Sequence, residues 1–123
     1  MRLGVSLKTV PATVHNADRL AFETALLLRI RDAQDTSAFD TLFNALAAKM
    51  LGYLVRSGGC SAGDGENLLQ DVWLTVWTKA HLFDPERASA RTWIFALARH
   101  AMIDLKRVRG REQQAFELYA LEH

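Results

Sequence analysis

The sequence predicts an all-α protein, folded as a compact bundle of about four helices. Apolar residues recur at intervals of three and four, which places them on one face of a helix, and residues that cap helices precede these stretches. No stretch of any length alternates apolar and polar residues as a half-buried strand would. With 123 residues and 50% hydrophobic content, the chain is expected to form one domain around a continuous apolar core.

The N-terminal part is expected to be a leader followed by a helix. Residues 1–15 show little periodicity and include Pro11, which is typical of a flexible segment. Asn16 or Asp18 can cap a first helix that runs to about Gln34.

A second helix is predicted from Asp35 or Thr36, either of which can cap it, to the Gly58-Gly59 pair, a common signal for a helix end. Its apolar residues at helical spacing are Phe39, Leu42, Phe43, Leu46, Met50, Tyr53 and Leu54.

A third helix is predicted to begin between Ser61 and Asp64 and to run to about His81. Its apolar side consists of Leu69, Val72, Trp73, Val76 and Ala80. The helical pattern ends at Phe83-Asp84-Pro85, because proline disfavours helical backbone in the residue before it.

A fourth helix, capped by Ser89, is predicted to reach about Gly110 and to have two unlike faces. The side expected to pack consists of Ile94, Leu97, Ala98, Ala101 and Leu105. The side expected to be cationic consists of Arg91, Arg99, Lys106, Arg107 and Arg109. Solvated arginines on an ordinary amphipathic helix are the alternative. The density of basic residues, opposed by Asp104 alone, favours nucleic acid, because arginine forks reach phosphates and base edges.

Charge is segregated along the chain, although its net value is only +1. Between residues 57 and 78 the charged residues are Asp64, Glu66 and Asp71, all acidic, whereas the charged residues of 87–111 are all basic except Asp104. This pattern suggests two partners of opposite character, with a plain solvated charged surface as the alternative.

The remaining composition excludes several classes of protein. Cys60 is the single cysteine and cannot form an internal disulfide, and His15, His81, His100 and His123 lack metal-ligand spacing, so we expect no metal and no cofactor. The apolar runs, among them residues 25–28, are far too short to cross a bilayer. A soluble protein in a reducing cytoplasm is expected.

Aromatic residues suggest two further roles. Trp93 enters the fourth helix after a short polar loop and is a candidate surface for stacking an unpaired base, with a core position as the alternative. Trp73 is expected in the core, whereas Trp77, with Gln70 and Asp71, is a candidate for helix docking on a partner.

No enzyme class fits the chain. Gly58 and Gly63 have the separation of the two P-loop glycines, but Asp64 and Gly65 stand where that motif needs lysine and a hydroxyl group. A nucleophile elbow and a paired-carboxylate motif are also missing from the sequence, so the chain is not expected to be an enzyme.

Three stretches, read in order, resemble region 2 of the extracytoplasmic-function (ECF) sigma factors: residues 38–43, 66–77 and 83–104. The last is the most specific, because Phe83-Asp84-Pro85, a capping Ser89, the Arg91-Thr92-Trp93 entry and a basic helix coincide there. The resemblance covers about residues 20–112. It divides the chain into a leader (1–15), a sigma region 2 domain (16–112) and the start of a linker with a tag-like tail (113–123).

The resemblance implies a domain that binds the RNA polymerase core and recognises and melts the promoter minus-ten element. The residues implied to contact the coiled coil of the largest polymerase subunit are Asn67, Gln70, Asp71 and Trp77. The residues implied to contact the non-template DNA strand are Arg87, Ser89, Arg91, Trp93, Ala96, Arg99, His100, Ile103, Lys106 and Arg107. An anti-sigma factor is a further expected partner.

The chain departs from the family pattern at three positions: Asn67 stands where aspartate is usual, Gly65 where alanine is usual, and His100 where asparagine is usual. We expect Asn67 to weaken core docking slightly and His100 to alter base preference at the upstream edge of the element.

Two other functions stay open. The chain could be a sigma mimic that binds an anti-sigma factor without binding DNA, or an unrelated helical regulator that binds duplex DNA. Nothing in it resembles the family's second helix-turn-helix domain, and Leu121-Glu122-His123 resembles a vector-derived junction to a histidine tag. The natural chain is therefore expected to continue.

Overall fold

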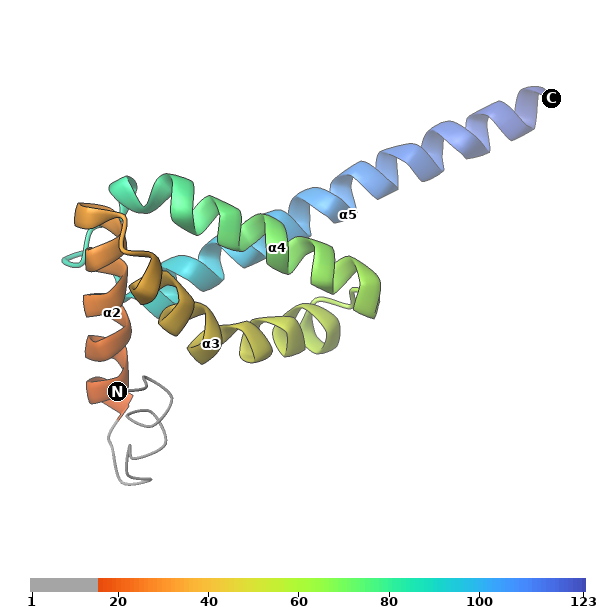
Figure 1. The fold of residues 1–123 in the computed structure, drawn as a ribbon. Coiled ribbons are helices and arrows are strands. Elements are labelled where there is room, and N and C mark those ends of the chain that lie inside the picture. Colours follow the sequence, from red (N-terminus) through yellow and green to blue (C-terminus); the bar gives the residue numbers. More distant parts are fainter. Residues whose placement is uncertain (1–15) are drawn as a thin grey trace.

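Four long helices and two short helical turns make up residues 16–123, the part of the chain that the computed structural model describes (Figure 1). They are α2 (Asn16–Ala33), α3 (Thr36–Gly52), the π-helical turn η1 (Tyr53–Ser57), α4 (Ala62–Lys79), the 3-10 turn η2 (Ala80–Leu82) and α5 (Ala90–Glu122). The predicted all-α class is confirmed for these residues. The predicted leader lies outside them.

The predicted caps Asp35 and Ser89 are confirmed, and Ser61, within the predicted start of the third helix, is a cap of the same kind. Asp35, Ser61 and Ser89 have extended backbone, and the side chain of each accepts a hydrogen bond from the backbone N–H three residues later. A cap of this kind satisfies one of the free N–H groups of the first turn and stabilises a helix by about 1 kcal/mol. The starts of α3, α4 and α5 are therefore determined by local sequence.

The second predicted helix ends as expected at Gly58, but its last turn widens into the π-helical turn η1. A Cβ atom at Gly58 would lie 2.0 Å from the sulfur of Met102 and 2.6 Å from the carbonyl oxygen of Leu54, so only glycine lets α5 pass this closely. Gly59 follows with φ +72°, a backbone conformation that side chains rarely adopt.

The core lies where α2, α3, α4 and the first turns of α5 meet. In Figure 1, α3 and α4 form a hairpin, α2 crosses one end of it, and α5 packs against α4 and crosses behind it. The fully buried large side chains are Leu27, Ile30, Leu42, Leu46, Met50, Leu54, Val72, Val76 and Ile94. Trp73 is 2% exposed, which confirms its predicted core position, and its ring meets those of Phe39 and Phe43 edge-on.

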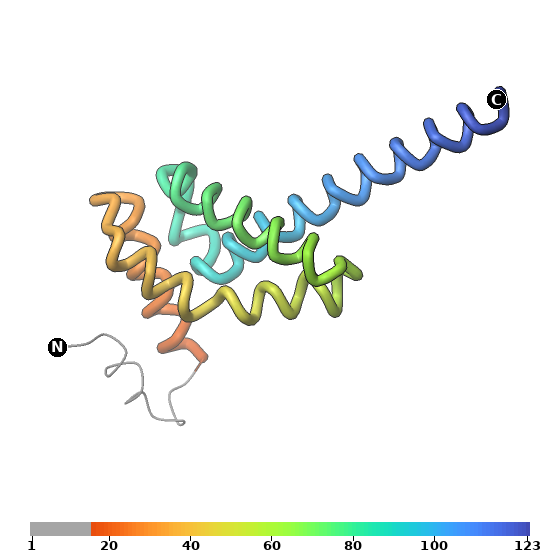
Figure 2. Tube along the Cα trace, turned by 45° about the vertical axis from the view of Figure 1, so that its right-hand side comes forward, coloured from red at the N-terminus to blue at the C-terminus, as the bar shows by residue number. Residues whose placement is uncertain are grey.

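The predicted end of the fourth helix near Gly110 is wrong. The helix α5 continues to Glu122, and in two views its last turns project away from the bundle (Figures 1 and 2). A lone glycine costs a helix only about 1 kcal/mol relative to alanine, and the residues that follow are good helix formers without a proline. They are Arg111, Glu112, Gln113, Gln114 and Ala115.

Candidate functional site

The outer side of α5 carries the predicted cationic face. Arg99, His100, Lys106 and Arg107 are exposed, while Ile94, Ala98 and Met102 on the opposite side are buried in the core. Ala96 and Ile103 are half-buried at the border between the two sides. The predicted division of this helix into a packing face and a basic face is confirmed.

The short loop before α5 is held by a turn around Asp84. The Asp84 carboxylate accepts a hydrogen bond from the Glu86 N–H at 2.9 Å, and the Asp84 carbonyl accepts one from the Arg87 N–H at 3.1 Å. Phe83 is buried and fixes the start of the loop, whereas Arg87 is exposed.

Trp93 lies half-buried next to this loop. Its ring packs at 60° against the ring of Phe83, with 5.6 Å between the ring centres. It is therefore neither a core residue like Trp73 nor a free surface residue. A partly exposed indole held by a buried neighbour is suited to stacking on a base.

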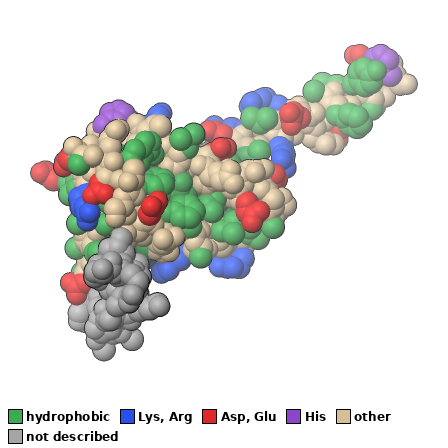
Figure 3. All heavy atoms as spheres, in the orientation of Figure 1, with side chains coloured by type: hydrophobic (Ala, Val, Ile, Leu, Met, Phe, Trp, Pro, Cys, Tyr) green, Lys and Arg blue, Asp and Glu red, His purple; other side chains and the backbone are tan. Residues whose placement is uncertain are grey.

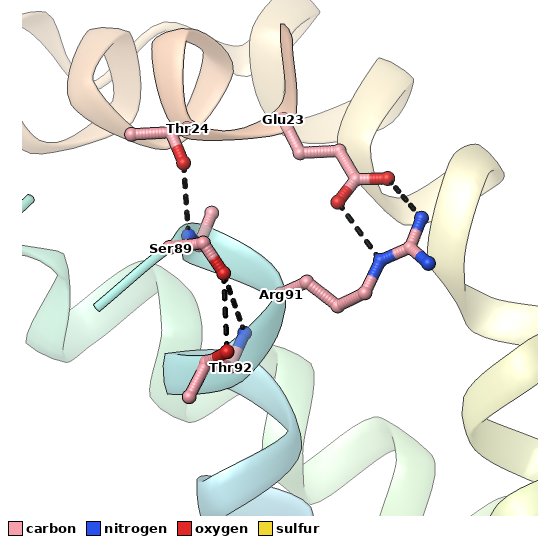
Figure 4. Close-up of polar contacts among 6 residues, drawn as sticks. Glu23, Thr24, Ser89, Arg91 and Thr92 are labelled. Carbon is pink, nitrogen blue, oxygen red and sulfur yellow. Dashed lines mark hydrogen bonds and ion pairs between the residues drawn. The ribbon is translucent and has the colours of Figure 1, made fainter. Parts of the chain in front are cut away.

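Arg91, at the start of α5, is engaged within the chain. Its Nε donates to Glu23 Oε1 at 3.0 Å, and its Nη2 donates to Glu23 Oε2 (Figure 4). The Glu23 side chain is 5% exposed and that of Arg91 is 32% exposed. The hydrogen bond to Glu23 raises the pKa of Arg91, against the opposing effect of burial. The Arg91 guanidinium therefore has a partner within the chain.

Two further contacts join α2 to the same region. The Ala90 N–H donates to the Thr24 hydroxyl at 3.0 Å (Figure 4), and Arg31 Nη1 donates to the Phe83 carbonyl at 3.2 Å. The sequence interpretation missed Glu23, Thr24 and Arg31. The signal available for Glu23 was its place on the apolar side of α2, together with Leu26 and Leu27.

A second ion pair joins α4 to α5. Asp64 accepts hydrogen bonds from Arg109 Nη1 at 2.6 Å and from Nη2 at 3.0 Å. The Arg109 guanidinium holds the pKa of Asp64 below its usual value, and Asp64 raises the pKa of Arg109. An acidic residue of the segment 57–78 and a basic residue of the segment 87–111 thus neutralise each other. The two segments are less separate in charge than the sequence predicts.

The exposed side of α4 forms a second candidate surface, which is polar and acidic, whereas the exposed side of α5 is basic. Asn67, Gln70 and Asp71 are exposed at helical spacing, and Leu74 continues their row with 63% of its surface exposed. Trp77 is half-buried, with its ring edge-on to that of Phe39 at 5.4 Å. The sequence interpretation missed Leu74, although its position seven residues after Asn67 places it on the same side.

A hollow of about 280 Å³ lies between α4 and α5. Asp71 and Thr75 line it from one helix, and His100 and Asp104 line it from the other. It therefore connects the exposed row of α4 with the basic face of α5. In the space-filling view, basic side chains lie on the part of the projecting α5 next to the bundle, and acidic side chains lie further towards its end (Figure 3).

Comparison with known proteins now identifies the domain. Residues 42–112 match the family model of sigma-70 region 2. The chain belongs to this family. It is 52% identical over 80 residues to the ECF RNA polymerase sigma factor RpoE of Cereibacter sphaeroides, an alignment that covers 65% of this chain and 44% of RpoE. It is 34% identical over 110 residues to SigK of Mycolicibacterium vanbaalenii, covering 87% of this chain and 54% of SigK.

A solved structure supports the same assignment. Rhodobacter sphaeroides SigE, in complex with the anti-sigma ChrR, superimposes with a TM-score of 0.65 and 48% sequence identity, over 69% of this chain and 51% of SigE. The chain thus spans about half the length of the relatives it matches. The resemblance to ECF sigma region 2 predicted from sequence is confirmed, and this is a family of transcription initiation factors rather than of enzymes.

Within this sigma-70 region 2, the predicted site residues fall into two groups. The predicted polymerase-binding residues lie on the exposed side of α4, except for Trp77, which is half-buried. The predicted DNA-binding residues lie along the loop and α5, and among them Arg91 pairs with Glu23. Their contacts with partners stay predictions. Among residues 16–123, no helix is long and apolar enough to cross a membrane, and no cluster of side chains suited to a metal ion is present.

Proposed function

We propose that this chain binds the RNA polymerase core through the exposed side of α4 and recognises and melts the promoter minus-ten element through the loop and α5. The observation that supports it best is the path of exposed basic residues that starts at Arg87 in the loop and continues along α5 with Arg99 and Arg107. A single DNA strand follows such a path by placing its phosphates on the cations and its bases on neighbouring side chains.

Recognition needs no covalent chemistry. A base leaving the duplex would stack on the half-buried ring of Trp93, one helical turn from the capping Ser89. Stacking contributes about 1–3 kcal/mol per base, and extruding a base from a duplex costs a few kcal/mol. Phosphate contacts by Lys106 and Arg107 supply the rest, so melting should weaken as salt is raised.

Upstream bases would face the border of the α5 surface. Ala96 and Ile103 offer half-buried apolar contacts, and Arg99 and His100 offer exposed hydrogen-bonding groups. The imidazole of His100 donates or accepts according to its tautomer and protonation state, which gives it a choice of base edges.

The polymerase contact would use a mixed surface. Leu74 provides an exposed apolar contact, and Asn67, Gln70 and Asp71 precede it in the same row with polar and acidic groups. Helix-on-helix docking commonly combines an apolar anchor with a polar rim. The coiled coil of the largest polymerase subunit is the proposed partner, and the cytoplasm is the proposed location.

A selection experiment tests the DNA half of the proposal. A fluorescent single strand with ten randomised positions is bound to the chain in the presence of polymerase core, and the bound fraction is sequenced. We expect one short element to be enriched and to bind at least tenfold more tightly than its scrambled version. No enrichment, with polymerase binding intact, would refute the proposed function. Equal binding to intact duplex without polymerase would instead indicate a DNA-binding role that does not depend on polymerase.

A second candidate function is an anti-sigma-binding mimic, favoured by the SigE structure, which contains the anti-sigma ChrR. Charge reversal at Arg99 and Arg107 separates the two functions, because both side chains are exposed and outside the core. It should abolish DNA binding by a sigma factor and spare anti-sigma binding by a mimic. An anti-sigma partner is also compatible with the primary proposal.

A further inference from the structure

The loop and the first turn of α5 are held from a distant part of the chain. Arg31, Thr24 and Glu23 of α2 contact residues that are 52, 66 and 68 positions away in sequence. Arg31 binds the carbonyl of Phe83 at the start of the loop. Thr24 binds Ala90, and Glu23 binds Arg91, at the end of the loop. Both ends of the loop are therefore attached to the same helix.

Each contact satisfies a group that would otherwise be costly. Ala90 is the first residue of α5, so its N–H has no partner within the helix, and the Thr24 hydroxyl accepts it. Ser89 satisfies the N–H of Thr92 in the same turn (Figure 4). Local sequence provides one half of this cap, and α2 provides the other half.

The Glu23 carboxylate is the most strongly constrained of these groups. It is almost completely buried, and a buried carboxylate is very unfavourable unless a cation and hydrogen bonds compensate it. Arg91 gives it both, through Nε and Nη2. Turning Arg91 towards a DNA phosphate would leave this carboxylate without its partner. The ion pair thus opposes the predicted DNA contact of Arg91.

We propose that Glu23, Thr24 and Arg31 are positioning residues for promoter recognition, and that Arg91 acts through Glu23 rather than on DNA. Together they hold the loop in the shape that places Arg87 and Trp93 beside one extruded base. The inference rests on the proposed function. The three positioning residues all lie on α2 (Asn16–Ala33), which precedes the residues that match the family model, since that match begins at residue 42.

The test is a double-mutant cycle on the ion pair. Glu23→Gln, Arg91→Gln and the double variant are compared with the full wild-type chain, bound to polymerase core. The probes are the enriched single strand and its scrambled version. We expect each single variant to lower the ratio of the two affinities by about five- to tenfold, because the loop loses its preorganisation. The double variant should fall no further, because both changes break one interaction.

One control variant and one further test variant separate an effect on DNA recognition from an effect on folding. Arg29→Gln, a substitution in the same helix as Glu23, breaks the ion pair in which Arg29 Nε and Nη2 both donate to Asp35 Oδ2, and it should leave the affinity ratio unchanged. Thr24→Val removes only the hydroxyl that accepts the Ala90 N–H, and it should lower the ratio by about threefold even if Glu23→Gln unfolds the chain. Thermal unfolding confirms that each variant is folded at the assay temperature.

The possible results separate this inference from the proposed function. If wild type discriminates between the probes and both Glu23→Gln and Thr24→Val retain its ratio, the contacts serve stability alone and the inference is wrong. If Arg91→Gln alone weakens both probes and reduces the salt dependence of binding, Arg91 contacts phosphate directly, which also overturns it. If wild type does not discriminate, the proposed function itself fails.

Discussion

Replacing Leu74 with alanine provides a sharp test of the polymerase surface. The side chain is 63% exposed on the outer side of α4, in the same row as Asn67, Gln70 and Asp71. Because so much of it already contacts water, its loss should change the free energy of unfolding by less than about 0.5 kcal/mol. Any larger effect of the substitution should therefore appear in binding.

The expected effect on binding follows from this exposure. Burying a fully exposed leucine side chain yields about 1.5–3 kcal/mol. The 63% that remains exposed would contribute roughly 1–2 kcal/mol on docking, and alanine keeps part of that. We therefore expect Leu74→Ala to weaken polymerase binding by about 1 kcal/mol, which is roughly a fivefold rise in Kd.

The assay is a titration of labelled chain with polymerase core, followed by fluorescence anisotropy. The matched control is Leu118→Ala, which removes the same side chain at the same 63% exposure from the projecting part of α5. It should leave the Kd unchanged. Equal Kd values for wild type and Leu74→Ala, or equal weakening by both substitutions, would refute the reasoning that α4 carries the docking surface.

Three further outcomes follow from the structure. The R99E/R107E variant loses the proposed phosphate contact of Arg107 and the exposed cation of Arg99 beside the bases, so the salt slope for single-stranded DNA should fall by at least about 0.7 with polymerase affinity kept, as filter binding at several salt concentrations would show. Ile94→Ala empties a fully buried position and should lower the free energy of unfolding in urea by about 3 kcal/mol, whereas a loss below about 1 would contradict the packing of α5. The hydrogen bond from the Ala38 N–H lowers the pKa of the Asp35 carboxyl below its usual value of 3.8. The ionised carboxylate therefore stabilises the fold fully above pH 3.8, and this stabilisation is lost as the pH falls through the lower pKa of the folded state. Asp35→Asn keeps a cap that does not titrate, and its thermal unfolding temperature should depend less on pH below 3.8.

Local chemistry explains why much of the fold could be predicted from the sequence. Asp35, Ser61 and Ser89 cap the helices that follow them, and each acts on a backbone group three residues away. The burial of Trp73 and the two-sided character of α5 follow from helical periodicity in the same way. Such features need no knowledge of distant contacts.

The features that sequence reasoning missed depend on pairing across the fold. In the sequence, Arg91 and Arg109 are two more basic residues on a cationic face. In the fold, Arg91 pairs with Glu23 of α2, and Arg109 pairs with Asp64 of α4. Periodicity shows on which side of a helix a charge lies, but it does not show which residue of another helix faces it. The continuation of α5 beyond Gly110 was missed because a glycine is a common stop signal, although the residues around this one favour helix.

The division of labour between α4 and the α5 surface is tested most directly by DNA melting. A duplex contains the selected element with one base replaced by a fluorescent analogue that stacking quenches, and polymerase core is added together with the chain. We predict that fluorescence rises with wild type, does not rise with R99E/R107E at saturating polymerase, and rises with Leu74→Ala only at higher protein concentration. If wild type binds polymerase fully and the base stays stacked, or if R99E/R107E melts the element equally well, the assignment of promoter recognition to this surface is wrong.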